Sequence, residues 1–320
     1  MAVDLTSNQW AGFLSAEREA FAKKLANDLP AGFSFRGLQW HELDGRRNEM
    51  AEFTFDGATF VLIPGGDVPL GFDAATWEPD ADEAESWAAT AEEYGFEGTV
   101  NDHVARVTRP PATATIKPFL METTAGQLGW EAASATDPDV VAVFNEHLRD
   151  KRRIDSVTVS KDAVSVRVQR RGEQITAHRM AAHTHATLTA MLGEQGFRLP
   201  TSDEWEYACG AGAATLFRWG DHAPASVYPT DESENGLAVN RAPNAFGLRI
   251  AADPYQNELV AEAQMTRGGD GGGTVCGGAG FFVGWLTLAT AYFEKDVCTR
   301  DPAEPIDAEF HVGRRVFPLV

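Results

Sequence analysis

The stretch Gly196–Asp221 constrains the fold more than any other part of the 320-residue chain. It reads GFRLPTSDEWEYACGAGAATLFRWGD, and it joins a helix-ending glycine, a short strand, a helix and an aromatic turn. Thr201 or Ser202 can cap the helix, so that Asp203 and Glu204 lie in its electropositive first turn. The stretch therefore predicts a capped helix whose apolar side packs on a core.

Two strings in this stretch, RLPTSDEWEYACGAG and FRWGD, resemble the signature of the formylglycine-generating enzyme (sulfatase-modifying factor) family. Further matches follow the family order at Phe60–Gly71, Ile116–Gln127, Ala242–Leu248, and Arg267–Gly269 with Gly313–Val316. The resemblance covers about residues 55–320 and implies an α+β domain of modified C-type-lectin-like fold with much irregular structure. Residues 1–54 are then a helix-and-strand extension, and insertions are expected at about 73–98 and 136–175.

The charge balance narrows the range of partners. The chain has 47 acidic and 27 basic side chains, for a formal charge of −20. Such a field repels nucleic acid and anionic membranes, and it favours cations, metal ions or basic partners. An acidic surface that only keeps the protein in solution explains the same charge. We expect no nucleic-acid partner and no membrane partner.

Cysteine usage and the N-terminus bear on the cellular compartment. Three scattered cysteines are too few for a disulfide framework. The N-terminal residues MAVDLTSNQW lack a basic region followed by an apolar core, so we expect a cytoplasmic protein. The uncharged stretch Gly271–Phe293 is long enough to span a bilayer. Its glycines and its polar Thr287 and Thr290 favour a buried strand pair with a glycine loop instead.

Periodicity predicts several further elements. Residues 5–29 read as one amphipathic helix capped by Ser7. Residues 33–43 and 52–55 read as strands of a hairpin with Asp44-Gly45 as its turn.

Both predicted insertions suggest a partner site. Residues 73–98 combine acidic and aromatic side chains around a helix, which suits a basic peptide, although a solvated insertion fits the composition too. A hairpin is expected at residues 156–169 in the second insertion, and a helix at His178–Leu192.

Oxygen-bearing side chains at two places are candidate calcium ligands. Asp231, Glu234 and Asn235 lie in a turn-like loop, and oxygen donors of this kind suit a hard cation. The family resemblance implies structural calcium near this loop and near a second segment, where only Asn257 and Glu258 can stand in. A solvated acidic loop explains the first group equally well.

Histidines offer a second kind of metal site. His178 and His185 share one face of the predicted helix, but a single pair makes no site. His183 has the wrong spacing from both. An iron or copper enzyme built on these side chains would need a third ligand, such as His311.

The resemblance also implies a copper site, and the chain departs from it. In the family's oxidase, two cysteines with four residues between them, soon after the Arg-Gly-Gly element, hold Cu(I). Soft thiolates select Cu(I) and leave it open to a substrate thiol and O₂. Here Cys276 alone lies near the first position as a catalytic candidate, Phe281 stands five residues on, and Cys298 lies too far along. We therefore expect Cys276 to be a small buried apolar residue.

The remaining binding candidates are Arg267, Arg314, Phe281 and Trp285. The arginines suit a carboxylate or phosphate, although an internal ion pair is their commoner role. We predict that the chain binds a peptide or protein segment without Cys-pair copper chemistry. The alternative is an iron- or copper-dependent oxidoreductase of the same scaffold, acting on a peptide or a small thiol or amine.

Overall fold

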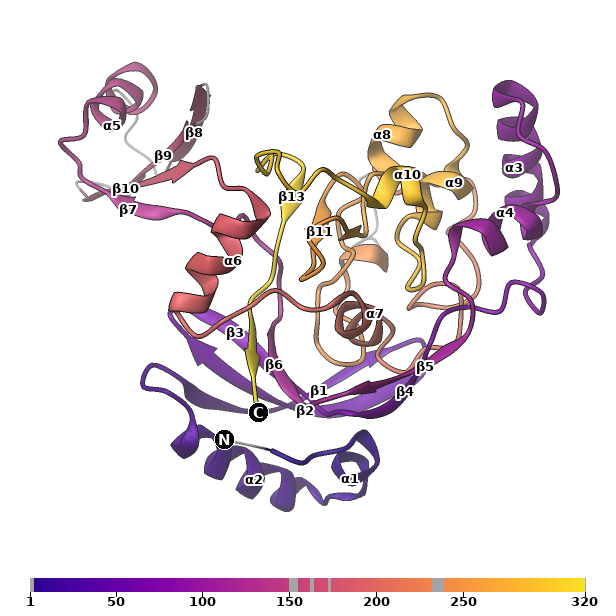
Figure 1. Cartoon of the computed structure of the whole chain (residues 1–320), viewed down its shortest axis with the longest axis horizontal. Helices are drawn as coiled ribbons and strands as arrows, with labels where there is room; N and C mark the ends of the chain where they lie inside the picture. Colours follow the sequence, from indigo (N-terminus) through magenta and orange to yellow (C-terminus); the bar gives the residue numbers. More distant parts are fainter. Residues whose placement is uncertain (1–2, 150–154, 162–163, 172–173, 232–238, 320) are drawn as a thin grey trace.

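A five-stranded antiparallel sheet is the layer on which the domain is built (Figure 1). The computed structural model describes residues 3–149, 155–161, 164–171, 174–231 and 239–319. The strands in spatial order are β1 (Ser34–Leu43), β2 (Arg46–Phe55), β3 (Ala58–Ile63), β6 (Phe119–Glu122) and β14 (Val316–Pro318). β14 pairs with β6 and forms one edge of the sheet, and β1 forms the other edge. The predicted α+β class is confirmed.

The central strands are buried on both faces, which explains their unbroken apolar runs. Phe60 and Leu62 point into a cluster beneath the N-terminal helices, whereas Val61 and Ile63 point into the main core. The expected hairpin is present, with Asp44 and Gly45 both at positive φ between β1 and β2. A two-residue turn of this kind matches the twist of its strands.

Two N-terminal helices cover the outer face of the sheet (Figure 1). The single helix expected over residues 5–29 is divided into α1 (Ser7–Gly12) and α2 (Ser15–Asp28). The predicted Ser7 cap is wrong, because Thr6 caps α1 and accepts a hydrogen bond from the Gln9 amide at 3.2 Å. Phe13 is extended and separates the two helices.

A partly buried ion pair and a hydrogen bond hold these helices on the sheet. Glu49 of β2 accepts from Arg18 at 3.0 Å, and its backbone carbonyl accepts from the Trp10 indole at 2.9 Å. Residues 34–54 lie within the central sheet, so the sheet crosses the expected boundary at residue 54 between the N-terminal extension and the domain.

The opposite face of the sheet carries the main core and most of the site-bearing elements (Figure 1). Its helices are α3 (Ala81–Tyr94), α4 (Val100–Val107), α6 (His185–Glu194), α7 (Ser202–Gly210), η2 (Val239–Arg241), α8 (Gly271–Cys276), α9 (Phe281–Leu286) and α10 (Lys295–Cys298). Small sheets join β4 (Gly66–Leu70) to β5 (Ala112–Ile116), and β11 (Asn257–Leu259) to β12 (Thr266–Arg267) and β13 (His311–Val312). The predicted cap of α7 is confirmed, since Thr201 and Glu204 form a capping box.

The second insertion forms a sheet of its own (Figure 1). Its order is β7 (Glu131–Ala133), β10 (Gln174–Ala181), β9 (Val164–Arg171) and β8 (Asp155–Lys161), packed by α5 (Pro138–Val143) and the π-helical turn η1 (Phe144–Leu148). The predicted hairpin is confirmed. The helix predicted from His178 is wrong at its start, because pairing with β9 keeps residues 174–181 extended and α6 begins at His185.

The apolar stretch 271–293 folds as helices α8 and α9 rather than as the expected strand pair. Their backbones approach closely, since a Cβ on Gly271 would lie 2.1 Å from the Gly284 carbonyl oxygen. The lack of a side chain on these glycines therefore allows the two helices to pack closely. Among the described residues, no helix has the length and apolar character needed to cross a membrane.

Candidate functional site

A hollow of about 390 Å³ lies between α3 and the loop that joins α8 to α9. We call it the acidic groove, since Asp82, Glu85 and Glu93 line it together with Tyr228 and Phe281. The carboxylates come from the first predicted insertion, and Phe281 comes from the apolar stretch. Two segments far apart in the sequence thus form one concave surface.

Backbone hydrogen bonds to α3 fix the far wall of the acidic groove. The Gly280 amide donates to the Thr90 hydroxyl at 2.9 Å, and the Phe282 amide donates to Ser86 at 3.2 Å. A Cβ on Gly280 would lie 2.4 Å from the Ser86 hydroxyl, so only glycine allows this approach. The groove is therefore built by packing before any ligand arrives.

The three carboxylates of the acidic groove are not neutralised by any residue that the structure describes. Asp82, Glu85 and Glu93 are exposed and project from one face of α3. None of them has a hydrogen bond or an ion pair through its side chain in the part of the chain that the structure describes. A cationic group entering the groove would therefore meet negative charge without displacing an internal partner.

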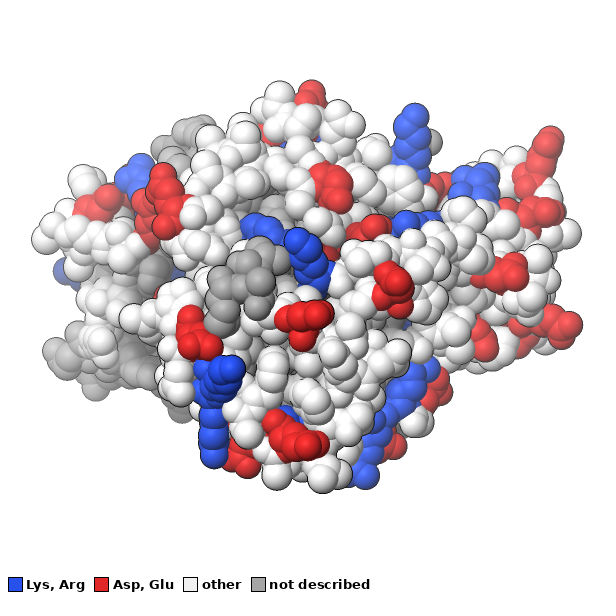
Figure 2. Space-filling model, turned by 60° about the horizontal axis from the view of Figure 1, so that its bottom comes forward, with Lys and Arg blue, Asp and Glu red and all other residues white. Residues whose placement is uncertain are grey.

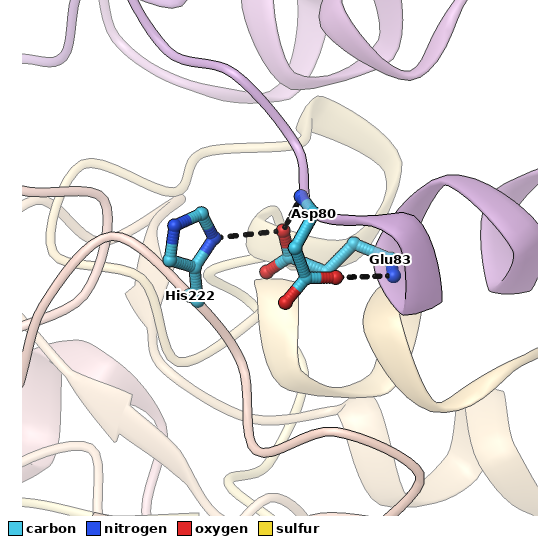
Figure 3. Close-up of side chains that lie close together, drawn as sticks. All are labelled: Asp80, Glu83 and His222. Atoms are coloured by element: carbon cyan, nitrogen blue, oxygen red, sulfur yellow. Dashed lines mark hydrogen bonds and ion pairs between the residues drawn. The ribbon is translucent and has the colours of Figure 1, made fainter.

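A cluster of Asp80, Glu83 and His222 lies at the start of α3 (Figure 3). His222 Nδ1 lies 3.0 Å from the buried Glu83 carboxylate, which also accepts from the Ala223 amide at 2.8 Å and from the Asp80 amide at 2.9 Å. The hydrogen bond to Glu83 raises the pKa of His222. Through these contacts, the Glu83 carboxylate holds the loop that contains His222 against α3.

The three cysteines lie in different environments. Cys276 is exposed on α8, so the expectation that it is buried is wrong. Its short helix begins with three glycines, and Tyr255 Oη lies 3.3 Å from its sulfur. Cys298 is 1% exposed, and burial raises its pKa to about 11, as it does for the core residue Cys209. All three thiols are free.

Three of the predicted binding residues serve the core instead. Arg267 donates to Glu206 at 2.7 Å and Arg314 donates to Glu258 at 2.8 Å, with all four side chains buried. Trp285 is 1% exposed and donates its indole N–H to the Val227 carbonyl. These three side chains are therefore engaged with internal partners.

The candidate calcium ligands fall in different places. Glu234 and Asn235 lie outside the described residues. Asp231 is exposed and accepts from the Tyr228 amide at 3.0 Å. Asn257 and Glu258 are buried on β11, and the Glu258 charge is matched by Arg314. This second position therefore lacks a free carboxylate for a cation.

His178, His185 and His311 lie on three different elements, whereas His183 and His311 line one small cavity. His178 lies on β10 and His311 on β13, while His185 on α6 is buried with Nε2 at 2.7 Å from the Val260 carbonyl oxygen. In the described ranges, the triad Asp80–Glu83–His222 is the group whose candidate ligand atoms lie within 4.8 Å of one another. Within those ranges, His178, His185 and His311 do not form such a group.

Sequence reasoning missed His222, Tyr255 and the individual groove carboxylates. The signal available for the carboxylates was their spacing, since Asp82, Glu85 and Glu93 share a helical face. His222 and Tyr255 carry no local signal, because their partners Glu83 and Cys276 lie 139 and 21 residues away.

Comparison with known families agrees with this fold. The sulfatase-modifying factor enzyme 1-like domain matches residues 46–249, which is more than half of the chain. A search of curated proteins gave no significant match. The matched range includes β2, β3, both insertions and the signature helix α7. The chain therefore belongs to the sulfatase-modifying factor enzyme 1-like family.

Proposed function

We propose that this protein binds a basic peptide or protein segment in the acidic groove. The observation that carries the proposal is the set of three carboxylates, not neutralised by any described residue, beside Tyr228 and Phe281 in one hollow. Lysine and arginine place charge against carboxylates while their stems pack on aromatic rings. The formal charge of −20 adds a long-range attraction for such a segment.

We also propose that the protein does not use the family's Cys-pair copper chemistry. Two thiolates are needed to hold Cu(I) in that reaction. Cys276 stands alone on the surface, and Cys298 is buried as a thiol with a pKa of about 11. This donor set does not fit the copper site, which leaves recognition as the role that the scaffold supports.

The binding proposal is tested with fluorescent octapeptides containing lysine or arginine. The triple variant D82N/E85Q/E93Q should bind the best peptide at least about 10-fold more weakly, as expected for charge-assisted contacts. The control D28N/E131Q/E194Q removes the same charge from exposed residues elsewhere. Equal weakening in both variants would show that only net charge matters, and would refute a groove.

Metal content tests the second proposal. The purified protein is exposed to Cu(I), Fe(II) and Ca²⁺, and its bound metal is measured by mass spectrometry. We expect neither copper nor iron at one equivalent. Stoichiometric copper that is lost in Cys276→Ala would refute the proposal and favour the oxidoreductase. Bound calcium would support a structural site near Asp231 and would leave both proposals standing.

A further inference from the structure

A second hollow of about 450 Å³ lies away from the acidic groove, beside β11 and β13. We call it the arginine pocket, because Arg241 and Arg249 both line it. Arg241 ends η2, and Arg249 is held by backbone pairing to Thr124, which lines the same pocket. The family signature strings contain neither arginine, and the acidic groove does not involve them.

Arg241 and Arg249 have no side-chain partner among the residues that the structure describes. Both are exposed, and neither side chain has a hydrogen bond or an ion pair within the described residues. The chain has 47 acidic side chains against 27 basic ones, so acidic neighbours are abundant. The two guanidinium groups line one cavity and have no described partner. They therefore give this acidic protein a local site of positive charge.

Two buried arginines lie next to the lining of the arginine pocket. Glu258 lies at its base, but Arg314 pairs with both of its oxygens, at 2.8 and 3.0 Å. Behind the wall, the fully buried Arg218 donates to the carbonyls of Asn240 and Ala251 and has no carboxylate partner among the described residues. Those carbonyls immediately precede two lining residues, Arg241 and Ala252.

We propose that the arginine pocket binds a ligand through a carboxylate group. A guanidinium fork matches the two oxygens of a carboxylate. The exposed carboxylate of Asp253 on the same wall opposes a doubly charged phosphate more than a single negative charge. Ala252 and Val312 give an apolar wall for the carbon part of the ligand. The volume falls in the range of small-molecule sites.

The test uses benzoate, hexanoate and N-acetylglycine, their neutral amides, and inorganic phosphate as probes. Binding is measured by saturation-transfer NMR on the full chain. We expect at least one carboxylate to bind, with its amide and phosphate each weaker. Arg241→Gln and Arg249→Gln should each raise the dissociation constant about 10-fold. Lys117→Gln, which removes one exposed charge elsewhere, should leave it unchanged.

Several results would overturn the inference. These are no binding by any of the three carboxylates, equal binding of acid and amide, tighter binding of phosphate, and unchanged binding in the arginine variants. Both arginines are exposed, so the variants should fold as the wild type does. Their unfolding midpoints check this, so that a loss of binding is not confused with a loss of folding. D82N/E85Q/E93Q should keep carboxylate binding, so failure of the acidic groove and failure of the arginine pocket can be told apart.

Discussion

At the residue scale, Glu258 is a buried carboxylate that accepts several hydrogen bonds in the core. It accepts from the Trp205 indole and the Ala251 amide, each at 2.9 Å, and it pairs with Arg314. Glu258→Gln leaves a buried guanidinium without a counter-charge, which should lower the free energy of unfolding by about 3–5 kcal/mol. Urea unfolding measures this loss. The exposed Glu85→Gln should stay within about 0.5 kcal/mol, and similar losses in both would contradict the assignment.

Cysteine exposure gives a second prediction at this scale. A thiol-reactive maleimide should label the native protein once, at Cys276, because Cys209 and Cys298 are buried. Urea should expose all three thiols. Intact-mass spectrometry counts the labels, and Cys276→Ser should remove the native one. Fast labelling of a second thiol in the native state would show that burial of the other two is wrong.

His222 gives a pH-dependent prediction. The hydrogen bond to Glu83 raises the pKa of His222, and Asp80 and Asp221 act in the same direction. An unfolded histidine has a pKa of about 6.5, so this stabilisation is complete below that pH and is lost as the pH rises through the higher folded pKa. Wild type should exceed His222→Gln in urea midpoint at about pH 5.5 and converge with it at about pH 9. A gap that grows with pH would refute the pairing.

At the scale of elements, the two additions to the sheet differ in how the core depends on them. Helices α1 and α2 cover Ala51, Phe53 and Phe60, which are fully buried. Deleting residues 1–32 would expose these side chains, and each large one contributes about 1.5–3 kcal/mol. We expect the truncated chain to aggregate or to unfold without a cooperative transition, as measured by size-exclusion chromatography and thermal unfolding. A cooperative monomer would contradict this.

The second insertion supplies its own apolar cluster and should be dispensable for folding. Glu131 of β7 and Arg179 of β10 are cross-strand partners, so their Cα atoms are about 5 Å apart and a short linker can join them. Replacing residues 132–178 with a Gly-Ser linker should keep a cooperative unfolding transition. The change removes the contact of Arg167 with Trp130, and loss of cooperativity would show that the body needs it.

At the scale of the whole molecule, net charge sets the range of attraction. Figure 2 shows acidic and basic side chains scattered over one face, rather than gathered in a block. With a formal charge of −20, association of a basic peptide should slow strongly between about 20 and 500 mM salt, because the Debye length falls severalfold. Stopped-flow fluorescence measures the rate. An association rate independent of salt would argue against electrostatic attraction.

The sequence by itself determined the elements whose signals are local. The helix cap at Thr201, one of the two residues predicted for it, the Asp44-Gly45 turn and the hairpin of the second insertion all depend on neighbouring residues, and all three were predicted. The signature strings gave the family and the fold class. Local signals failed where tertiary pairing prevailed, as in the strand through His178.

Only the tertiary structure decided the sites. The acidic groove joins α3 to a loop nearly 200 residues later, and the Glu83–His222 contact spans 139 residues. The tertiary structure also determined that the glycine-rich stretch 271–293 forms helices, because the close approach of the α8 and α9 backbones depends on what packs around them. Burial separated Arg267 and Arg314, which are neutralised in the core, from Arg249, which faces a cavity. Periodicity reports the face of an element, whereas availability of a charge depends on every segment that packs beside it.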